Sequence, residues 1–281
     1  MTTKTVNSVQ SLYFSPTGST RKIVETVSKA MGVPVKTPIS ITTPQERDSF
    51  SGQVEGDLLI VGVPVYTGTF PSLILSPLNK IDGNGHWALP IAVCGNVRMG
   101  TCLAELCGIL KRQGFNIPAA GNFIAQHSFA CEEFPIGKGR PDVEDLRKAI
   151  EFGSRVVNKI AKDPEDITYQ YGRNTYIRMY ASGSIEAKGF ASMGEGYRPL
   201  IRVNDHIDEM CPECNLCVEV CPTGSIDPES YRIEDETCIR CFACTDVCES
   251  GVKEKVVHPK EHLASWFRHR ALERGEPLLF I

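Results

Sequence analysis

Short apolar runs alternate with amphipathic stretches along the first 160 residues of the chain. Residues 57–63 and 89–94 form two apolar runs, and residues 9–14 and 117–125 form two more, as is typical of strands buried on both faces. Between and after these runs, apolar residues recur at helical spacing. Strands that alternate with helices predict an α/β fold with a doubly wound parallel sheet.

Three apolar stripes mark the expected helices. The stripes consist of Ile23, Val24, Val27 and Ala30; of Leu103, Leu106, Cys107 and Leu110; and of Val143, Leu146, Ile150, Val156, Val157 and Ile160. Pro141 precedes the third stripe at a place that suits the first turn of a helix. We expect the stripes to pack against the sheet, with Cys94 and Cys107 in the core.

Polar loops follow three of the expected strands, at residues 15–20, 64–71 and 95–100. Ligands bind at the carboxyl ends of strands in sheets of this kind, so all three loops lie at the expected ligand edge. The first loop, Ser15-Pro16-Thr17-Gly18-Ser19-Thr20, offers hydroxyls and backbone N–H groups at a positive helix end, which suits a phosphate dianion. It has neither the lysine of a Walker loop nor three spaced glycines, which favours a phosphomonoester over ATP or NAD. Taken alone, such a loop is equally typical of an ordinary N-capped helix.

Eight of the twelve cysteines form two copies of one pattern near the C-terminus. Both copies read C-x2-C-x2-C-x3-C, the bacterial ferredoxin spacing that holds two cubane iron–sulfur clusters. Zinc ribbons, the alternative, use two C-x2-C pairs and leave the third and fourth cysteine of each copy unexplained. A disulfide framework is disfavoured because the chain is long and shows no secretory signal. The pattern therefore predicts two 4Fe-4S clusters and transfer of single electrons.

The fourth cysteine of such a run usually ligates the other cluster. One cluster is therefore expected on Cys211, Cys214, Cys217 and Cys248, and the second on Cys238, Cys241, Cys244 and Cys221. Pro222 follows Cys221, as in the ferredoxin motif, whereas Glu249 takes the place of the second proline. A carboxylate beside a cluster adds negative charge, which lowers the reduction potential of that cluster.

The loop at residues 15–20 resembles the flavodoxin phosphate loop T-x-T-G-x-T, with serine in the first place. Followed by the cysteine runs, it is similar to the flavodoxin–ferredoxin fusion family of anaerobic bacteria and archaea. Gln126-His127-Ser128-Phe129 and Arg140-Pro141-Asp142 also resemble that family, and the similarity covers most of residues 7–162 and 205–256. The resemblance implies a five-stranded flavodoxin-like sheet, a small α+β ferredoxin domain, FMN and two 4Fe-4S clusters.

The resemblance also implies which residues hold FMN. Ser15, Thr17, Gly18, Ser19 and Thr20 would bind its phosphate; Val65, Tyr66, Thr67, Gly68 and Phe70 would line one side of the isoalloxazine; and Asn96, Val97, Arg98 and Gly100 would line the other. Tyr66 or Phe70 would stack on the ring, although burial in the core is an equally common place for Phe70. Arg98 would stabilise a reduced, anionic flavin by its charge, or lie on the surface as a solvated residue.

A chain of 281 residues is long enough for two domains. We expect a flavodoxin-like FMN-binding domain at residues 1–162, an aromatic-rich connecting segment at 163–202, a two-cluster ferredoxin domain at 203–256 and an apolar docking tail at 257–281. No apolar run reaches the length of a transmembrane helix and no signal peptide is visible, which predicts a cytoplasmic protein without a membrane span.

Charge is distributed unevenly along the chain. Residues 1–160 contain 16 Lys and Arg against 13 Asp and Glu, whereas residues 203–256 contain 4 against 13. The acidic cluster domain is expected to attract a basic face on a redox partner protein and to repel nucleic acid. Solubility alone is the alternative reason for an acidic face.

These features predict an electron relay between redox partner proteins, because clusters exchange single electrons whereas FMN exchanges one or two. The alternative is an FMN-dependent reductase that acts on a small substrate, with the ferredoxin domain as its electron input and His127 or Tyr66 as the proton donor. A redox sensor is a third class. The sequence leaves open whether the protein is an enzyme, which donor and acceptor it uses, and whether it forms a homodimer.

Overall fold

The structure is a computed structural model that describes residues 5–97, 100–162, 166–167, 200–207, 211–259 and 261–281. Its strands are β1 (Val9–Tyr13), β2 (Ile39–Ser40), β3 (Leu58–Pro64), β4 (Trp87–Cys94), β5 (Ala120–Ile124), β6 (Ile201–Asp205), β7 (Lys253–Val257) and β8 (Leu278–Phe280). Its helices are α1 (Ser19–Ala30), α2 (Pro44–Ser49), η1 (Ser72–Ile74, a 3-10 turn), α3 (Leu75–Lys80), α4 (Cys102–Arg112), α5 (Val143–Ala161), α9 (Leu216–Glu219), α10 (Ala243–Asp246) and α11 (Glu261–Leu272). Arg98 and most of the aromatic-rich segment lie outside the described residues.

Strands β1 to β5 form a parallel sheet in the order β2-β1-β3-β4-β5. This is the order of flavodoxin-like folds, so the predicted doubly wound architecture is confirmed. The five predicted parallel strands are present, and β8 pairs with β5 as a sixth, antiparallel strand that was not predicted. Such a strand gives no periodic signal, since it is three residues long and its partner lies far away in the sequence.

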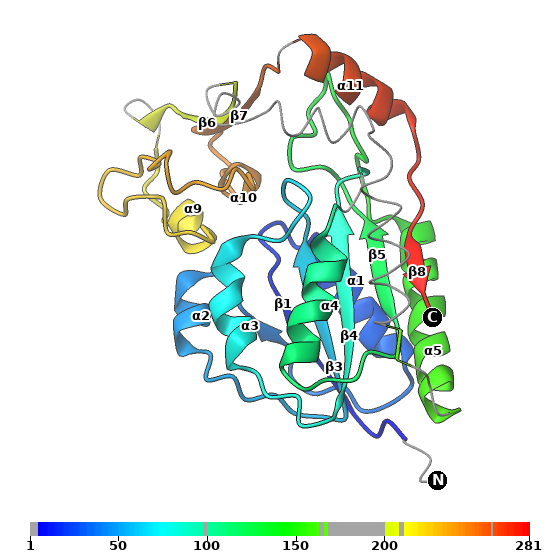
Figure 1. The fold of residues 1–281 in the computed structure, drawn as a ribbon. Coiled ribbons are helices and arrows are strands. Elements are labelled where there is room, and N and C mark those ends of the chain that lie inside the picture. Colours follow the sequence, from blue (N-terminus) through cyan, green and yellow to red (C-terminus); the bar gives the residue numbers. More distant parts are fainter. Residues whose placement is uncertain (1–4, 98–99, 163–165, 168–199, 208–210, 260) are drawn as a thin grey trace.

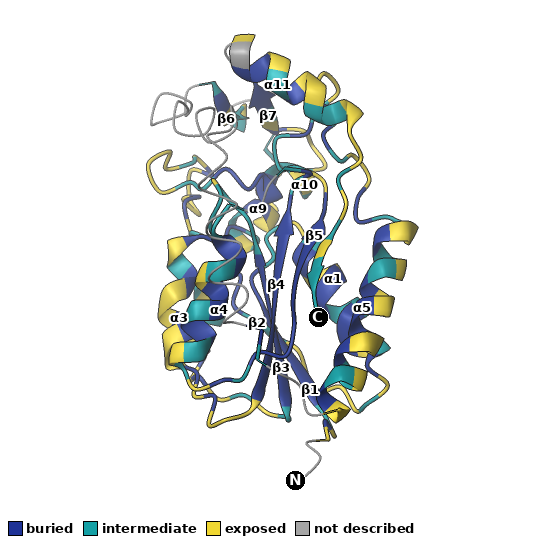
Figure 2. Ribbon diagram, turned by 45° about the vertical axis from the view of Figure 1, so that its right-hand side comes forward, coloured by how far each residue is buried: buried dark blue, intermediate teal, exposed yellow. Residues whose placement is uncertain are grey.

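Helices cover both faces of the sheet, and the strands between them are buried (Figure 2). Helices α1 and α5 pack together on one face, and α3 and α4 lie on the other (Figure 1). Gly62 in β3 lets α1 approach the sheet closely, because a Cβ at this position would collide with the side chain of Val24. This close contact fixes the start of α1 at the carboxyl edge of the sheet.

The three apolar stripes form helices α1, α4 and α5. Within α5, however, Val143 and Ile150 are exposed, and the buried face instead runs through Phe152. Pro141 lies outside the helix, which begins after an Asp142 cap. The stripe prediction therefore placed the helix correctly but included two positions of its solvent face. Cys94 and Cys107 are buried, as predicted, and none of the twelve cysteines forms a disulfide.

The cysteine-rich region lies beyond the carboxyl ends of the sheet strands (Figure 1). Its strands β6 and β7 form an antiparallel pair, and α9 and α10 are single helical turns within the two cysteine runs. The residues that precede these turns, Asn215 and Phe242, have φ angles of 63° and 64°. Equivalent positions in the two runs thus share a left-handed backbone, so the sequence repeat is also a structural repeat. The small α+β unit agrees with the prediction.

The C-terminal tail contacts both parts of the molecule. Helix α11 shares a hydrophobic core with each of them, formed by Phe134, Ile136, Ile201, Phe242, Val257, Leu263, Ala264 and Phe267. From α11 the chain runs back along the sheet domain and ends in β8 (Figure 1). None of the described helices is long and apolar enough to cross a membrane.

Candidate functional site

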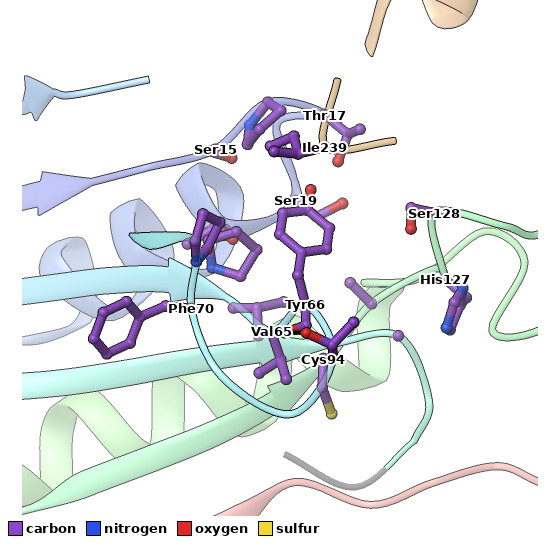
Figure 3. Close-up of a pocket in the computed structure, with 18 of the residues that line it drawn as sticks. Ser15, Thr17, Ser19, Val65, Tyr66, Phe70, Cys94, His127, Ser128 and Ile239 are labelled. Carbon is purple, nitrogen blue, oxygen red and sulfur yellow. Dashed lines mark hydrogen bonds between the residues drawn. The ribbon is translucent and has the colours of Figure 1, made fainter. Parts of the chain in front are cut away.

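A cavity of about 380 Å³ lies at the carboxyl edge of the parallel sheet. Four loops of the sheet domain line it, and Cys238 and Ile239 of the cysteine-rich region complete its wall (Figure 3). A concave, partly apolar site of this volume suits a small ligand or cofactor. The four loops follow β1, β3, β4 and β5, and they include all three loops singled out from the sequence.

The hydroxyl-rich loop after β1 leads directly into helix α1. The helix begins at Ser19 after its N-cap Gly18, whose φ is 80°. The N–H of Arg21 donates to Oγ of Ser15 at 3.0 Å, so the N–H groups of Ser19 and Thr20 are the ones left for an anion. The Oγ1 atom of Thr42 accepts the N–H of Ser15 at 2.9 Å and so fixes the start of the loop. Ser15, Thr17, Ser19 and Thr20 all line the cavity.

The loop after β3 forms a tight turn at the cavity wall. Tyr66 and Thr69 exchange backbone hydrogen bonds of 2.7 and 3.1 Å, and Thr67 and Gly68 between them have positive φ angles of 52° and 86°. The ring of Tyr66 lies in the middle of the cavity (Figure 3). Phe70 is 5% exposed and belongs to the hydrophobic core, with its ring directed away from that of Tyr66. Phe70 thus lines the cavity from the side of the core, whereas the ring of Tyr66 projects into it.

The loop after β4 divides its residues between the cavity and the tail. Val97 lines the cavity, whereas the side chain of Asn96 is 3% exposed and makes four hydrogen bonds elsewhere. Its amide donates to the carbonyl oxygens of Arg270 and Glu273, and its carbonyl accepts from the Arg140 guanidinium and the Gly275 N–H. The hydrogen-bonding capacity of Asn96 is thus used by the tail rather than offered to the cavity.

Two glycines bring the second and third loops into contact. A Cβ at Gly100 would collide with the backbone of Gly68, and the N–H groups of Thr101 and Cys102 donate to the Gly68 carbonyl at 2.7 and 3.1 Å. The start of α4 therefore holds the turn of the neighbouring loop in place. Gly68 lines the cavity, whereas Gly100 supports it from behind.

His127 lies on the wall formed by the loop after β5. Its Nδ1 atom accepts the N–H of Phe129 at 3.0 Å, which leaves the proton of the neutral ring on Nε2. Burial, reinforced by the positive charge of Lys255, lowers the pKa of His127 to about 4. Burial also raises the pKa of Tyr66 well above its usual value, and Cys241 adds to this effect. Neither side chain has the pKa near neutrality that suits a general acid.

Two further cavities are each lined by four cysteines. Cys211, Cys214, Cys217 and Cys248 line one of about 150 Å³, and Cys221, Cys238, Cys241 and Cys244 line the other. Each set therefore combines three cysteines of one run with the last cysteine of the other run. This grouping is the one expected for crossed ligation of two cubanes.

The last cysteine of each run also receives a backbone hydrogen bond. The N–H of Ser225 donates to Sγ of Cys221 at 3.3 Å, and the N–H of Lys253 donates to Sγ of Cys248 at 3.4 Å. Donors to sulfur stabilise thiolate charge, which is the form that binds metal. The donor set thus fits a thiolate-ligated cluster at both positions.

The two cysteine cavities differ in their relation to the large cavity. Cys238 and Ile239 line both the large cavity and the cavity that contains Cys221, whereas the other cysteine cavity shares no lining residue with the large one. We therefore name the set with Cys221 the proximal site and the set with Cys248 the distal site. No local feature of the sequence indicates the placement of Cys238 and Ile239, because this placement depends on how the two regions pack.

Comparisons with known proteins found one family model and several similar solved structures. Residues 204–255 match the family model of a 4Fe-4S dicluster domain, and no curated protein matches the chain. A flavodoxin from the domain Archaea is 13% identical over 54% of this chain and 98% of its own, with a TM-score of 0.39. A flavodoxin from Streptococcus pneumonia is 17% identical over 54% and 99%, with a TM-score of 0.39. A WrbA-like flavodoxin from Agrobacterium tumefaciens is 16% identical over 57% and 99%, with a TM-score of 0.39. The strand order and the dicluster match together give the chain the arrangement of a flavodoxin–ferredoxin fusion.

Proposed function

We propose that this protein is an iron–sulfur flavoprotein that relays electrons between two 4Fe-4S clusters and FMN, and exchanges them with redox partner proteins. The observation that carries the proposal is the position of Cys238 and Ile239, which belong at once to the wall of the large cavity and to the proximal site. A flavin and a cluster held there would be neighbours in one chain. When bound, FMN supplies exchange of one or two electrons.

The residues of the large cavity fit FMN. The N–H groups of Ser19 and Thr20 at the start of α1 and the hydroxyls of Ser15, Thr17 and Ser19 suit its phosphate. Val65, Val97 and the ring of Tyr66 offer flat or apolar surface to the isoalloxazine.

The cysteines of the proximal and distal sites fit two cubanes, one in each site. Ile239 lines both the flavin cavity and the proximal site, and Cys241 of the proximal site adds to the raised pKa of Tyr66 inside the cavity. The distal site lies farther out, and its Cys214 is exposed. We therefore propose that the distal site faces partner proteins and the proximal site faces the flavin.

The exposed surface near the distal site is negatively charged. Glu213 and Glu249 flank its cysteines in the sequence, and both are exposed. A partner with a basic docking face would be attracted to this surface, at a rate that falls with ionic strength. The free cysteines fit a reducing compartment, and we place the relay in the cytoplasm on that ground.

The electrostatics of the cavity favour a carrier over a substrate reductase. A reductase needs a group that delivers a proton near neutral pH, and the two candidates are His127 and Tyr66. The low pKa of His127 leaves it neutral, and the raised pKa of Tyr66 makes it a weaker acid than usual. Both side chains are better suited to shaping the cavity than to proton transfer.

The cofactor content of the purified protein tests whether the proposed clusters and FMN are bound. After anaerobic purification we expect roughly eight iron atoms and eight acid-labile sulfides per chain, since two four-iron cubanes each take four cysteines. The flavin released by heat should be FMN. Two zinc ions without labile sulfide, or recovery of FAD, would contradict the proposal.

Thr17→Val should weaken FMN binding without unfolding the sheet domain. The substitution removes an exposed hydroxyl at the phosphate loop and leaves a phosphate oxygen without a donor, at a cost of about 1–3 kcal/mol, or roughly 5- to 150-fold in affinity. Fluorescence titration of the apoprotein with FMN measures the change. Thr26→Val is the matched control, because Thr26 lies on α1 and donates its hydroxyl to the Lys22 carbonyl, away from the cavity. Equal affinities in the two variants would argue against this phosphate site.

A further inference from the structure

The few basic residues of the acidic cysteine-rich region are unevenly placed. Of the four Lys and Arg between residues 203 and 256, Arg232 is exposed, Arg240 and Lys253 are buried, and Lys255 is partly buried. The surface of this region is therefore even more acidic than its composition, and its positive charge is concentrated inside, beside the cysteines.

Lys255 occupies the junction between the two regions. Its Nζ atom lies 4.8 Å from the ring centroid of Phe242, the residue that follows Cys241 in the proximal run. The same atom lies 3.5 Å from the carbonyl oxygen of Ala130, in the loop that carries His127. One ammonium group thus lies against the proximal run on one side and against the loop after β5 on the other.

The charge of Lys255 interacts electrostatically with groups on both sides of the junction. Lys255 helps to lower the pKa of His127. Burial lowers the pKa of Lys255 itself, whereas Asp246 opposes that shift by its negative charge and Cys131, Cys244 and Cys241 act in the same direction as Asp246. Both Cys241 and Cys244 belong to the proximal site, and no distal cysteine is among these four groups.

The neighbouring cation on β7 is placed differently. Lys253 lies 3.4 Å from the carboxylate of Asp205 and donates to the Tyr231 carbonyl, and it lines the distal cavity. Its charge is thus offset by an adjacent carboxylate with 14% exposure. Lys255 and Lys253 share one face of the strand, but Lys255 lies against Phe242 of the proximal cavity, whereas Lys253 lines the distal cavity.

We propose that Lys255 tunes the relay by raising the reduction potential of the proximal cluster above that of the distal cluster. A positive charge at short range stabilises an added electron, and cluster potentials follow local charge and exposure. An electron that enters at the distal site would then move toward the flavin rather than back to the surface. This inference rests on the proposed function, since it assumes a cluster in each site.

Lys255→Met should lower the potential of one cluster only. We expect the equilibrium constant for moving an electron from the distal to the proximal cluster to fall about tenfold, which corresponds to 59 mV for one electron. A redox titration of the holoprotein followed by electron paramagnetic resonance resolves the two clusters. Lys255→Arg keeps the charge and should keep this equilibrium constant within about twofold of the parent value.

Two control variants separate a local effect from a change in net charge. Arg232→Met removes an exposed charge from the same region. It should change the equilibrium constant between the two clusters by no more than about twofold, because solvent screens the charge. Glu249→Gln removes a carboxylate that lines the distal cavity, so it should raise the potential of the other cluster. The two clusters are thereby assigned, since Lys255→Met and Glu249→Gln should affect different signals in opposite directions.

Asp246→Asn keeps the inference testable if Lys255→Met loses its proximal cluster. Asp246 opposes the charge of Lys255, so its neutralisation should raise the proximal potential. Equal shifts in Lys255→Met and Arg232→Met, or shifts of the same signal in Lys255→Met and Glu249→Gln, would overturn the inference. If the potentials behave as expected but the flavin is not reduced through the clusters, the relay fails and the tuning by Lys255 stands.

Discussion

Cys221→Ala should remove the proximal cluster and leave the distal cluster in place. Cys221 closes the first cysteine run, yet it lines the cavity of Cys238, Cys241 and Cys244 from the second run. The variant should therefore retain about four of about eight iron atoms, because each cubane holds four. Iron and sulfide analysis with electron paramagnetic resonance measures the loss.

Cys131→Ala is the matched control for this substitution, since Cys131 is partly buried and lies in neither cysteine cavity. It should keep the full iron content. Selective loss of the distal cluster in Cys221→Ala would show that the two runs do not exchange their last cysteines.

Asp145→Ala should destabilise the sheet domain by about 3–5 kcal/mol, because it leaves a buried guanidinium without its counter-ion. Asp145 and Arg140 form an ion pair with side-chain exposures of 0% and 5%. The Arg140 guanidinium also donates to Asn96 and to the Gly275 carbonyl, so the pair supports the attachment of the tail. Urea unfolding of the variant and the parent protein measures the difference.

The control for this prediction is Glu151→Ala on the same helix. Glu151 lies 3.9 Å from Arg155, and both side chains are more than half exposed. An exposed pair of this kind contributes little, so the control should lose less than about 1 kcal/mol. Similar losses in the two variants would mean that the Arg140–Asp145 pair does not stabilise the fold.

Local sequence patterns were sufficient for the parallel sheet and for the cysteine sets. Apolar runs identified four of the five parallel strands because a strand buried on both faces needs apolar residues throughout. The cavity loop at residues 15–20 was visible in the sequence because its hydroxyls and Gly18 follow a strand and precede a helix. The grouping of Cys221 with the second run came from the regular spacing of the motif.

Features made by distant segments could not be read from such patterns. Strand β8 is three residues long and depends on the open edge of β5. Asn96 was predicted to line the isoalloxazine because the tail that uses its amide lies far along the chain. Ile239 has no local feature that marks it as part of the large cavity. In each case the role of the residue depends on a segment that lies far away in the sequence and contacts it only in the folded structure.

The tail also determines how the relay should be tested. Strand β8 belongs to the sheet, and Asn96 and Arg140 bind the tail, so a fragment of residues 1–162 would lose part of its own fold. The test must therefore keep the full chain and remove a cluster by substitution.

The most direct test is the rate of FMN reduction by a low-potential donor protein with a basic docking face, measured by stopped flow in the parent protein and in Cys221→Ala. The account predicts fast reduction of FMN in the parent protein and far slower reduction in the variant. The rate in the parent should fall steeply with added salt, because exposed charges are screened beyond about 8–10 Å. Equal rates in the two proteins, each with FMN bound, would show that electrons do not reach the flavin through the proximal cluster.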